Sequence, residues 1–559
     1  MIDPRLLERK RYLFDASIHE AAGRHEEAVT WYRKALEAGD PDPRIYHLLA
    51  VACRRSGQFN AAEEALSAAM SIAGQTPTLL AEQAEIAAAR GKPGKARAMM
   101  QHAASGDHPD PDILLRCAEL ALEDGDAPGA VMAALRARTA GANAEQVLAR
   151  ACLRLGDLPA AARAAETAYD AGPGNPAIAG LLASIRVRQG RLKEARNIAK
   201  KAGGEAIGLL ADAFKEIGDP QGALPFYETA LSAHPDDADL AFNRATALLA
   251  AGRIDDGFDQ YECRWQRPGK AMRPFTPPRW SGEELAGKHL LVWTEQGLGE
   301  EILHLRALGM AVGLASDVTV EVTDRLVPLV ARAFPGITVV PRQNPPHAAT
   351  LDPGIDLQCP AADLIRHLGA APMSDTSLAA DRQLRDTLSR RYRDGTTNFL
   401  AGICWSTERT PAAASKSIPT PLLAPLLRIP GIDWVSLQFG EAGNAEISRL
   451  EARTDRHIRR DPAIDALRNL DDSAAQIDAL DIAVCISTTA AHLAGALGKD
   501  VRVVLNSRPL WHWGTDRVSC RWYPSARLYR QPEPGDWATP LGALRRDLEK
   551  MVEAAASDR

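Results

Sequence analysis

The chain has 559 residues, of which 46% are hydrophobic and 25% charged, and its formal net charge is -6 at pH 7. This length predicts about three or four domains, and the ordinary globular composition argues against wholesale disorder. The acidic balance gives no electrostatic reason to expect nucleic acid as a partner. The first residues, MIDPRLLERKRYLF, lack the features of a secretory signal, and no apolar run approaches the ~20 residues of a membrane span.

Cysteine usage adds a further exclusion. The eight cysteines are scattered, with no CxxC pair and no histidine cluster beside them. That pattern disfavours both structural zinc and a disulfide framework. The sequence therefore predicts a soluble, reduced, cytoplasmic protein with no metal site, no nucleic-acid partner and no membrane span.

Residues 10–266 carry an internal repeat. Glycines recur at positions 23, 57, 91, 125, 156, 190, 218 and 252, with five gaps of 34 residues and two shorter gaps of 31 and 28. An alanine stands seven residues before every one of these glycines, and alanine also recurs five and twelve residues after seven of them. A glycine that ends one helix, followed by small residues that let the next helix pack closely, predicts short antiparallel helix pairs stabilised by stacking.

This pattern resembles the tetratricopeptide repeat, and the stretch GRHEEAVTWYRKALEAGDPDP is close to its consensus. The resemblance predicts an α-solenoid of about eight units over residues 10–266, whose groove binds a protein. The alternatives are a role in oligomerisation or as a spacer. The last unit departs from the pattern and carries Phe258, Tyr261 and Trp265, which predict a cap that docks onto the following domain.

The segment RPGKAMRPFTPPRW contains four prolines, Pro268, Pro274, Pro277 and Pro278, and cannot form a helix. It predicts a semi-rigid Pro-rich linker over 267–284 and a domain boundary there. On that basis we expect residues 1–266 and residues 281–559 each to fold alone.

Short β-branched runs alternate with helical segments after this linker. Seven of them are typical of strands: KHLLVW, DVTVEV, GITVV, FLAGICW, DWVSL, DIAVCIS and DVRVVL. The alternation predicts an α/β fold with parallel sheets, arranged as two Rossmann-like halves over 285–395 and 396–559. Ligands of such sheets bind beyond the carboxyl ends of the strands, so the loops after these strands hold the candidate site residues.

Two glycines and two glutamates follow the first predicted strand. Gly297 and Gly299, after Gln296, let backbone amides approach a ligand at the start of a helix. Glu300 and Glu301 begin that helix. They are either catalytic carboxylates or residues that are simply favourable at the positive end of the helix dipole.

Two more loops carry groups suited to an anion. Lys416 stands ahead of a helix after FLAGICW, although a surface lysine is an equally simple interpretation. Ser487, Thr488 and Thr489 lie where DIAVCIS meets a helix, so their hydroxyls and the helix N–H groups predict a diphosphate site. Simple capping of the helix would explain one of these hydroxyls. His492, one turn later, is either a further ligand contact or a buried structural histidine.

Four stretches of the second half resemble a known family: WTEQGLGEEILHLRAL, KSIPTPLLAPLL with GIDWVSLQFG, ALDIAVCISTTAAHLAGALGKDV, and CRWYPSARLYRQPEPGDW. They are similar to the carboxyl-terminal domain of bacterial tetratricopeptide glycosyltransferases. Those enzymes have the GT-B fold and are similar to heptosyltransferases and to O-linked N-acetylglucosamine transferases. Alphaproteobacterial flagellin glycosyltransferases, which attach nonulosonic acids to Ser or Thr, share the same layout.

The resemblance implies roles for particular residues. Lys416 and the segment Thr488–His492 would hold the nucleotide phosphates, Gln438 would lie near the nucleotide, and Gly297 and Gly299 would shape the cleft between the halves.

Three places depart from the family's pattern. Glu300 stands where the family often has Asp after GLG, and Ser487 stands where an acidic residue or Asn often precedes the threonine pair. The loop 406–415, STERTPAAAS, is also unusual for the family. If Glu300 is the general base, its longer side chain must still reach the acceptor hydroxyl.

The family resemblance and the loop residues together predict an inverting, metal-independent glycosyltransferase with Glu300 as its base. A nucleotide sugar would be its cosubstrate, without any other cofactor. No Asp-x-Asp triplet occurs after residue 266, and those at Asp40/Asp42, Asp110/Asp112 and Asp237/Asp239 lie in predicted repeat turns. The repeats would hold the acceptor protein, with flagellin as the candidate. The alternatives are a non-catalytic repeat scaffold with a decayed transferase domain and a glycolipid transferase of the lipopolysaccharide type. The absence of a basic amphipathic stretch argues against the glycolipid alternative.

Overall fold

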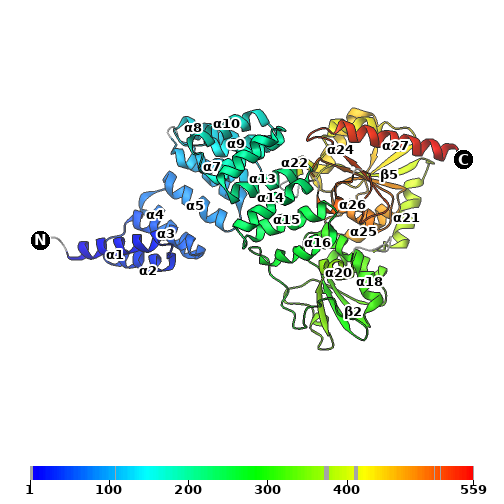
Figure 1. The fold of residues 1–559 in the computed structure, drawn as a ribbon, viewed down its shortest axis with the longest axis horizontal. Helices are drawn as coiled ribbons and strands as arrows, with labels where there is room; N and C mark the ends of the chain where they lie inside the picture. Colours follow the sequence, from blue (N-terminus) through cyan, green and yellow to red (C-terminus); the bar gives the residue numbers. More distant parts are fainter. Residues whose placement is uncertain are drawn as a thin grey trace. The chain divides into compact units, whose positions relative to one another are not determined.

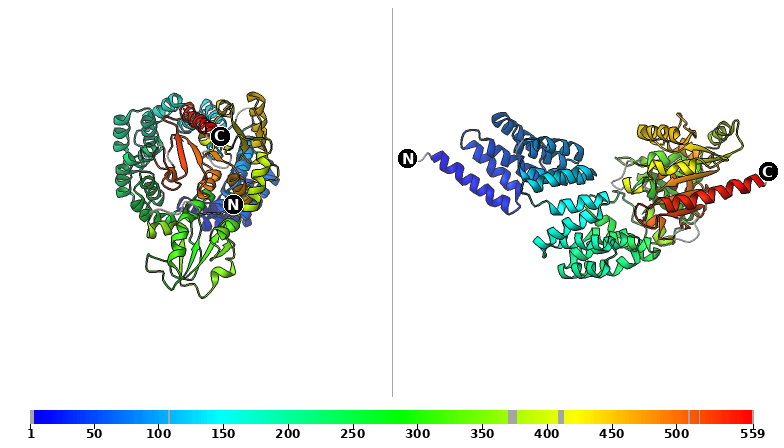
Figure 2. Two further views of the ribbon diagram at one scale, coloured as in Figure 1. Left: turned by 90° about the vertical axis from the view of Figure 1, so that its right-hand side faces the viewer. Right: turned by 90° about the horizontal axis from the view of Figure 1, so that it is seen from above.

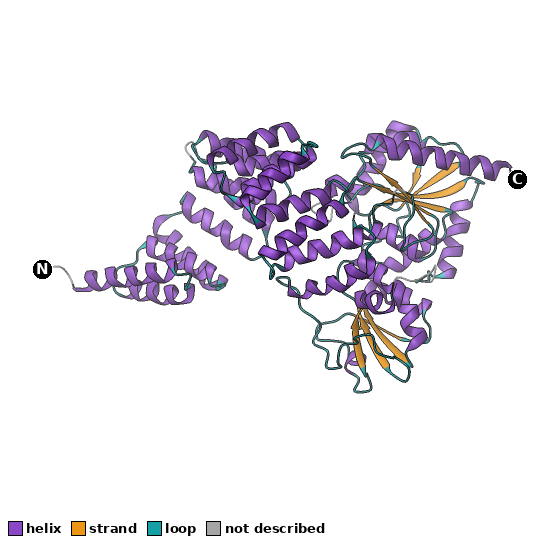
Figure 3. Cartoon of the chain, viewed as in Figure 1, coloured by secondary structure: helices purple, strands orange, loops and turns teal. Residues whose placement is uncertain are grey.

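The computed structural model describes residues 4–106, 109–369, 377–407, 413–508, 510–516 and 518–557. The chain divides into two compact units, residues 1–202 and residues 203–559. Within the described residues the first unit is entirely helical, and all strands lie in the second unit (Figure 3). None of the described helices combines the length and the apolar character that crossing a bilayer requires.

The predicted repeat helices are present in the described residues as eight pairs, six in the first unit and two in the second (Figure 1). Within each unit, successive pairs pack side by side (Figure 2). The first unit contains α1 (Pro4–Ala21), α2 (His25–Glu37), α3 (Pro43–Arg55), α4 (Phe59–Ala73), α5 (Pro77–Ala89), α6 (Pro93–Ala103), α7 (Pro111–Glu123), α8 (Ala127–Thr139), α9 (Glu145–Leu155), α10 (Leu158–Ala171), α11 (Pro176–Arg188) and α12 (Leu192–Ala202). The second begins with α13 (Gly204–Glu216), α14 (Pro220–Ala233), α15 (Ala238–Ala250), α16 (Ile254–Gln260) and the 3₁₀-helix η1 (Tyr261–Gln266).

The alanine and glycine columns explain why these helices pair. All eight repeat glycines have φ between +71° and +93°, a backbone conformation that side chains other than glycine rarely adopt. The alanines seven residues before them are all completely buried, which lets the two helices of each pair pack closely. The tetratricopeptide interpretation of the first half is therefore confirmed at the level of the fold.

The Asp-x-Asp triplets have a local structural role. Asp42, Asp110 and Asp237 each precede a helix, and each carboxylate accepts a hydrogen bond from a backbone N–H of the first turn. These aspartates therefore cap α3, α7 and α15, as expected for acidic residues in repeat turns.

The first α/β half contains a four-stranded parallel sheet in the order β3-β2-β1-β4. The central strand β1 is apolar and buried on both sides, and Leu291 lies in register with Thr319 of β2 and Gln358 of β4. The strands are β1 (His289–Trp293), β2 (Asp317–Val322), β3 (Thr338–Pro341) and β4 (Leu357–Pro360). The helices are α17 (Leu298–His304), α18 (Leu308–Leu314), α19 (Val327–Ala333) and α20 (Ala361–Leu368), with η2 (Leu305–Ala307), η3 (Asp324–Leu326) and η4 (Ala348–Leu351).

The second half contains a six-stranded parallel sheet in the order β10-β9-β8-β5-β6-β7, which repeats the order of the first sheet and adds two strands. Gly402 of β5 lies in register with Val435 of β6 and Ala483 of β8. The strands are β5 (Phe399–Cys404), β6 (Ile432–Ser436), β7 (Ile458–Arg459), β8 (Ile482–Ile486), β9 (Val501–Leu505) and β10 (Ala526–Arg530). The helices are α21 (Arg382–Arg393), α22 (Ala413–Lys416), α23 (Ala424–Leu427), α24 (Gly440–Thr454), α25 (Leu470–Asp478), α26 (Thr489–Ala496) and α27 (Ala538–Ser557), with η5 (Thr420–Leu423) and η6 (Trp511–Trp513).

All seven strands predicted from the sequence are present, and the sheets are parallel as expected. Three observed strands had no sequence signal: β4, β7 and β10. The first ends in proline, the second is only two residues long, and the third places charged residues between apolar ones. Such short or charged segments become strands only because a neighbouring strand is available to pair with them.

The Pro-rich segment is irregular, as its prolines predict, but it is not a spacer. Trp280 is 3% exposed, and its backbone N–H donates to the carbonyl of Gln358 at 2.8 Å. The N–H of Gln358 donates in return to the carbonyl of Pro278 at 3.0 Å. The segment thus runs along the edge strand β4 and extends the first sheet.

The expected domain boundary at 267–284 is therefore wrong, because the compact second unit already begins at residue 203. Phe258 and Tyr261 of the last repeat are buried in the same hydrophobic core as β1 and β4. Arg264 forms buried ion pairs with Glu295 and Asp363 of the first α/β half. The prediction of an aromatic cap docked on the next domain is confirmed, and its docking is what removes the boundary.

Two fragments test this correction. We expect residues 203–559 to unfold cooperatively and residues 281–559 to lack a cooperative transition. The shorter fragment loses the buried aromatic residues of the last repeat. It also leaves Glu295 and Asp363 buried without Arg264, which costs about 3–5 kcal/mol. Calorimetry and near-ultraviolet circular dichroism distinguish the two results. Equal melting temperatures for both fragments would restore the boundary at the Pro-rich segment.

Candidate functional site

Both sheets reverse their strand order at one point, which is where open α/β sheets bind ligands. The chain passes from β1 to β2 and β3 on one side and returns with β4 on the other, and β5 and β8 repeat this arrangement. The sequence-predicted residues lie just beyond these strands. Gln296, Gly297, Gly299 and Glu300 follow β1, Lys416 follows β5, Gln438 follows β6, and Ser487, Thr488, Thr489 and His492 follow β8.

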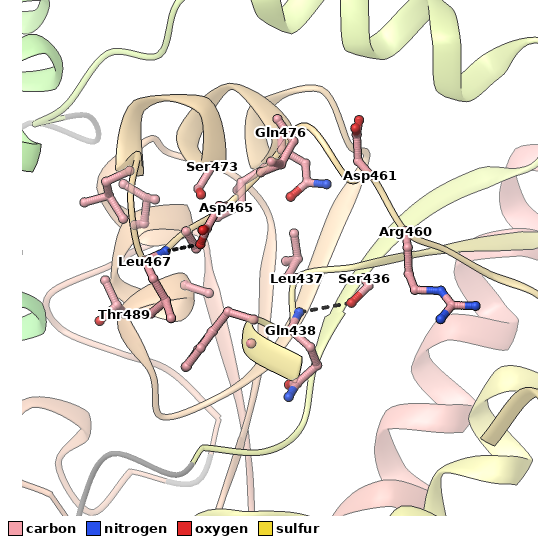
Figure 4. Close-up of a pocket in the computed structure, with 18 of the residues that line it drawn as sticks. Ser436, Leu437, Gln438, Arg460, Asp461, Asp465, Leu467, Ser473, Gln476 and Thr489 are labelled. Carbon is pink, nitrogen blue, oxygen red and sulfur yellow. Dashed lines mark hydrogen bonds between the residues drawn. The ribbon is translucent and has the colours of Figure 1, made fainter. Parts of the chain in front are cut away.

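A cavity of about 680 Å³ lies at this edge of the second sheet (Figure 4). Its wall is formed by the loops after β6 and β7 and by α25 and α26, and Leu298 and Arg325 of the first half complete it. Gln438 and Thr489 line the cavity, as Figure 4 shows. The remaining predicted donor-binding residues lie outside its lining.

The side chain of Gln438 connects the loops after β5 and β6 through hydrogen bonds. Its Oε1 accepts hydrogen bonds from the backbone N–H groups of Trp405 at 2.8 Å and Ser406 at 3.1 Å. Its Nε2 donates to the hydroxyl of Ser406 at 2.7 Å, and that hydroxyl donates to Glu446 at 3.0 Å. The amide of Gln438 therefore holds the rim of the cavity in shape through three hydrogen bonds.

The three hydroxyls at the start of α26 have different surroundings. Ser487 Oγ accepts a hydrogen bond from Trp513 Nε1 at 2.9 Å, and Thr488 Oγ1 donates to the carbonyl of Ile486 at 3.3 Å. Thr489 Oγ1 has no hydrogen-bond partner among the described residues. None of the three caps α26 through its side chain. The simple capping interpretation therefore does not account for these hydroxyls.

His492 is buried and uncharged. Its Nδ1 lies 3.0 Å from the hydroxyl of Tyr523, and its ring centroid lies 4.8 Å and 4.9 Å from those of His512 and Trp513. Burial lowers the pKa of His492 to about 3. A Cβ atom added at Gly299 would come within 2.8 Å of the imidazole, so this glycine lets α17 pack against α26.

Glu300 and Glu301 are adjacent in sequence but differ in environment. Glu301 is fully buried and accepts hydrogen bonds from the hydroxyls of Thr294 and Thr323, which makes it a structural residue. Glu300 is half-buried and accepts a hydrogen bond from Trp511 Nε1 at 3.1 Å. Burial raises the pKa of Glu300, although that hydrogen bond and the nearby positive charges act in the opposite direction.

Lys416 of the second half lies near enough to Glu300 for their charges to interact. Burial lowers the pKa of Lys416, while the negative charge of Glu300 acts to raise it. The ammonium group has no hydrogen-bond or ion-pair partner in the parts of the chain that the structure describes. The two halves thus bring together one carboxylate and one ammonium that are both partly removed from water.

A smaller cavity of about 210 Å³ lies on the other side of the loop after β1. Thr294, Glu295 and Gln296 line it, and the end of the last repeat and the Pro-rich segment close it. Gln296 has φ of +69°, an uncommon conformation for a residue with a side chain. The Nε1 of Trp265 and the Nε of Arg273 are buried beside this cavity, without a hydrogen-bond acceptor among the described residues.

Sequence reasoning missed several of the residues around the site. Arg325, Arg460 and Asp461 also line the large cavity. Arg460 and Asp461 follow β7, which has no sequence signal, whereas Arg325 lies in η3 after the predicted strand DVTVEV. Trp511 and Trp513 could have been predicted from the sequence. The WHW triplet follows the predicted strand DVRVVL and so places two indole donors near a strand end.

Comparison with known proteins defines the class of the first half. Sequence profiles of the tetratricopeptide repeat match residues 12–43, 43–76, 153–206 and 209–269. Together with the helix pairs, these matches make the first half a tetratricopeptide-repeat solenoid.

One curated relative extends beyond the repeats. Protein FlbA of Caulobacter vibrioides is 28% identical over 352 residues, which cover 59% of this chain and 58% of FlbA. The chain therefore spans less than two thirds of the length of that relative. The aligned share of this chain exceeds either the repeat array or the region that follows it, so the alignment includes parts of both.

Solved structures add only a general likeness to helical repeats. A tetratricopeptide repeat protein from Parabacteroides merdae is 13% identical, with a TM-score of 0.35, over 43% of this chain and 98% of its own. Yeast Tom70 is 14% identical, also with a TM-score of 0.35, over 46% of this chain and 59% of its own. At scores below 0.5, nothing about function follows from these similarities.

The hydroxyls at the start of α26 generate a prediction. Replacing Thr488 and Thr489 together by alanine should weaken nucleotide binding about tenfold or more, because a hydrogen bond to a charged group contributes about 1.5–3 kcal/mol. Calorimetric titration with CMP, UDP and GDP measures the change, and Thr387→Ala on the exposed face of α21 is the matched control. Unchanged affinity in a folded double variant would leave this loop without a role in binding.

Proposed function

We propose that the protein is a nucleotide-sugar-dependent GT-B glycosyltransferase that modifies Ser or Thr of an acceptor protein. The observation that carries the proposal is the path of the loop after β1. Gln296 lines the small cavity and Leu298 lines the large one. Glu300 follows in the same segment, and the charges of Lys270 and Lys416 act on it. A donor in the large cavity and an acceptor side chain in the small one would both contact this loop, which leads into Glu300.

The proposed reaction uses the groups that surround this loop. Glu300 accepts the proton of the acceptor hydroxyl, and the hydroxyl oxygen attacks the anomeric carbon of the donor sugar. The bond from that carbon to the nucleotide phosphate breaks, and its electron pair leaves with the nucleotide. Attack from the face opposite the leaving group inverts the anomeric configuration. Lys416, the Thr489 hydroxyl and the first-turn N–H groups of α26 stabilise the phosphate charge without requiring a metal ion.

The acceptor and the sugar are proposed from the resemblance of the second half to flagellin glycosyltransferases. On that basis flagellin is the acceptor protein and a nonulosonic acid is the transferred sugar. The FlbA alignment supports treating the repeats and the α/β region as one functional protein, because it includes parts of both.

The central test replaces the proposed base. Glu300→Gln keeps the size of the side chain but cannot accept a proton, so the initial rate of transfer to purified flagellin should fall by about 10²–10⁴-fold. Intact-mass spectrometry of flagellin measures the rate, and Glu284→Gln on the exposed surface is the matched control. Retention of the normal rate would refute Glu300 as the base. A folded wild-type chain that binds no nucleotide would instead support the scaffold alternative.

The pH dependence of the wild-type rate tests the same assignment. Burial raises the pKa of Glu300, so its basic form is lost as the pH falls through a value above the ~4.3 of an ordinary glutamate. The rate should therefore decline on the acid side, with an apparent pKa above that value. This decline should be absent from the residual activity of Glu300→Gln. An acid limb shared by both proteins would assign it to another group.

The repeats are proposed to recruit the acceptor. The cavities can hold only a small part of a protein, whereas a repeat solenoid offers an extended surface. The second unit, residues 203–559, should retain the nucleotide affinity of the full chain but transfer sugar to flagellin much more slowly. Calorimetry and intact-mass measurement on the same preparation separate the two effects. Transfer by the second unit at the full rate would favour the spacer alternative.

A further inference from the structure

We propose that the η6 turn, Trp511–Trp513, is the positioning element of the candidate site and that the last repeat holds this turn in place. The proposal rests on the proposed function in treating Glu300 and the start of α26 as the groups to be positioned. It goes further by assigning two tryptophans to these groups and by making the last repeat part of the site.

One turn bonds to both sides of the site. Trp511 Nε1 donates to Glu300 at 3.1 Å, and Trp513 Nε1 donates to Ser487 at 2.9 Å. Glu300 belongs to α17 of the first half, and Ser487 precedes α26 of the second. An indole carries a single N–H donor on a rigid ring, so each ring directs one hydrogen bond to one partner. The geometry of η6 therefore determines the relative positions of the two groups.

The last repeat packs directly on this turn. The ring of Trp511 meets Phe258 of α16 edge-on at 5.9 Å between centroids, and it lies 6.3 Å from Tyr261 of η1. On another side it stacks on His304 at 6.0 Å. Phe258 is 2% exposed and Tyr261 is completely buried. Trp511 is thus enclosed by rings, and two of them belong to the repeat.

The neighbouring repeat contacts the chain just before η6. Arg508 forms an ion pair with Glu216 at the end of α13. A Cβ atom added at Gly218 would lie 3.4 Å from the carbonyl oxygen of Ser507. Helix α15 also packs against η6. Both repeats of the second unit therefore support the segment that carries the two indoles.

The arrangement provides a physical route from the repeats to the proposed chemistry. A shift of Phe258 or Tyr261 moves the ring of Trp511, and its hydrogen bond to Glu300 then lengthens or breaks. The titratable groups that face Glu300 are Lys270, Lys416 and Tyr261. A Trp511→Phe change leaves all three in place and removes the indole donor together with part of the ring. Comparison with the same change at a neighbouring tryptophan that does not bond to Glu300 therefore isolates the hydrogen bond.

The experiment uses the full chain and two readouts that do not depend on catalysis. The first is the rate at which a carbodiimide labels Glu300 as a function of pH, followed by peptide mass spectrometry. The second is the calorimetric affinity for whichever of CMP, UDP and GDP binds the wild-type protein most tightly. Trp522→Phe is the matched control, because Trp522 packs on Trp511 at 5.9 Å and does not bond to Glu300 or Ser487.

Each of the two η6 variants should change one of the two measurements. Trp511→Phe should shift the titration of Glu300 upward by about one pH unit, because a hydrogen bond to a carboxylate favours its charged form. Trp513→Phe should weaken nucleotide binding about 3–10-fold, because the Ser487 hydroxyl loses the donor that orients it. Trp522→Phe should change neither. A structural role alone would lower the melting temperature of all three without separating the readouts, and that result would overturn the proposal.

The contribution of the repeat is tested at Phe258. Phe258→Ala removes the ring behind Trp511 and touches no group of the site, so the titration of Glu300 should move in the same direction as in Trp511→Phe. Phe258→Leu, which retains much of the bulk, should restore it. An unmoved titration in a folded Phe258→Ala variant would overturn the role of the last repeat.

These outcomes are independent of the proposed activity. If Glu300→Gln retains normal transfer while Trp511→Phe shifts the labelling curve, the base assignment fails and the positioning role stands. If Glu300→Gln is inactive and the labelling curve does not move, the positioning role fails and the base assignment stands.

Discussion

Arg264 carries the connection between the last repeat and the α/β region. Its guanidinium is 2% exposed, and it binds Glu295 in the loop after β1 and Asp363 in the first turn of α20. Removing these charges from water is costly, and the arrangement holds because Arg264 serves both carboxylates and Arg279 forms a second ion pair with Asp363. The start of the loop that leads to Glu300 depends on this buried ion-pair cluster, and so does the position of the last repeat. A solenoid that would otherwise end before the Pro-rich segment becomes part of the same core as the first sheet.

Glu300 is partly removed from water, and the charges of Lys270 and Lys416 act on it. Burial lowers the pKa of His304 and His492 to about 3 and that of His512 well below its ordinary value, so the three imidazoles are neutral near pH 7. Burial raises the pKa of Glu300, whereas the hydrogen bond from Trp511 and the charges of Lys270 and Lys416 favour its charged form. A carboxylate with a raised pKa is a better proton acceptor than one in water. The aromatic packing that attaches the last repeat also holds Trp511, whose indole bonds to Glu300.

Much of the architecture was predictable because its signals are local. The repeat glycines require a left-handed backbone, and the alanines beside them require close helix contacts, so a 34-residue period is visible without any structure. The central strands are β-branched and buried on both faces, which makes them recognisable as continuous apolar runs. The site loops could also be placed, because parallel strands bring their carboxyl ends to one edge. The sequence predicted Glu300 as the base, and only the hydrogen bonds of Glu301 to Thr294 and Thr323 show that the neighbouring glutamate is structural.

By itself the sequence determined the repeat solenoid, the two parallel sheets, and the loops in which a site would lie. Only the tertiary structure decided that the chain divides at residue 203, that the Pro-rich segment is held against β4, and that two indoles bond to the candidate site. The physical reason for this difference is how far apart along the chain the interacting residues lie. Helix pairing and strand formation follow from residues within a few turns of each other. In contrast, Arg264 and Asp363 are 99 positions apart, and Glu300 and Trp511 are 211 positions apart. No local pattern records which of many buried charges and rings will meet, because that choice is made only when the core closes around them.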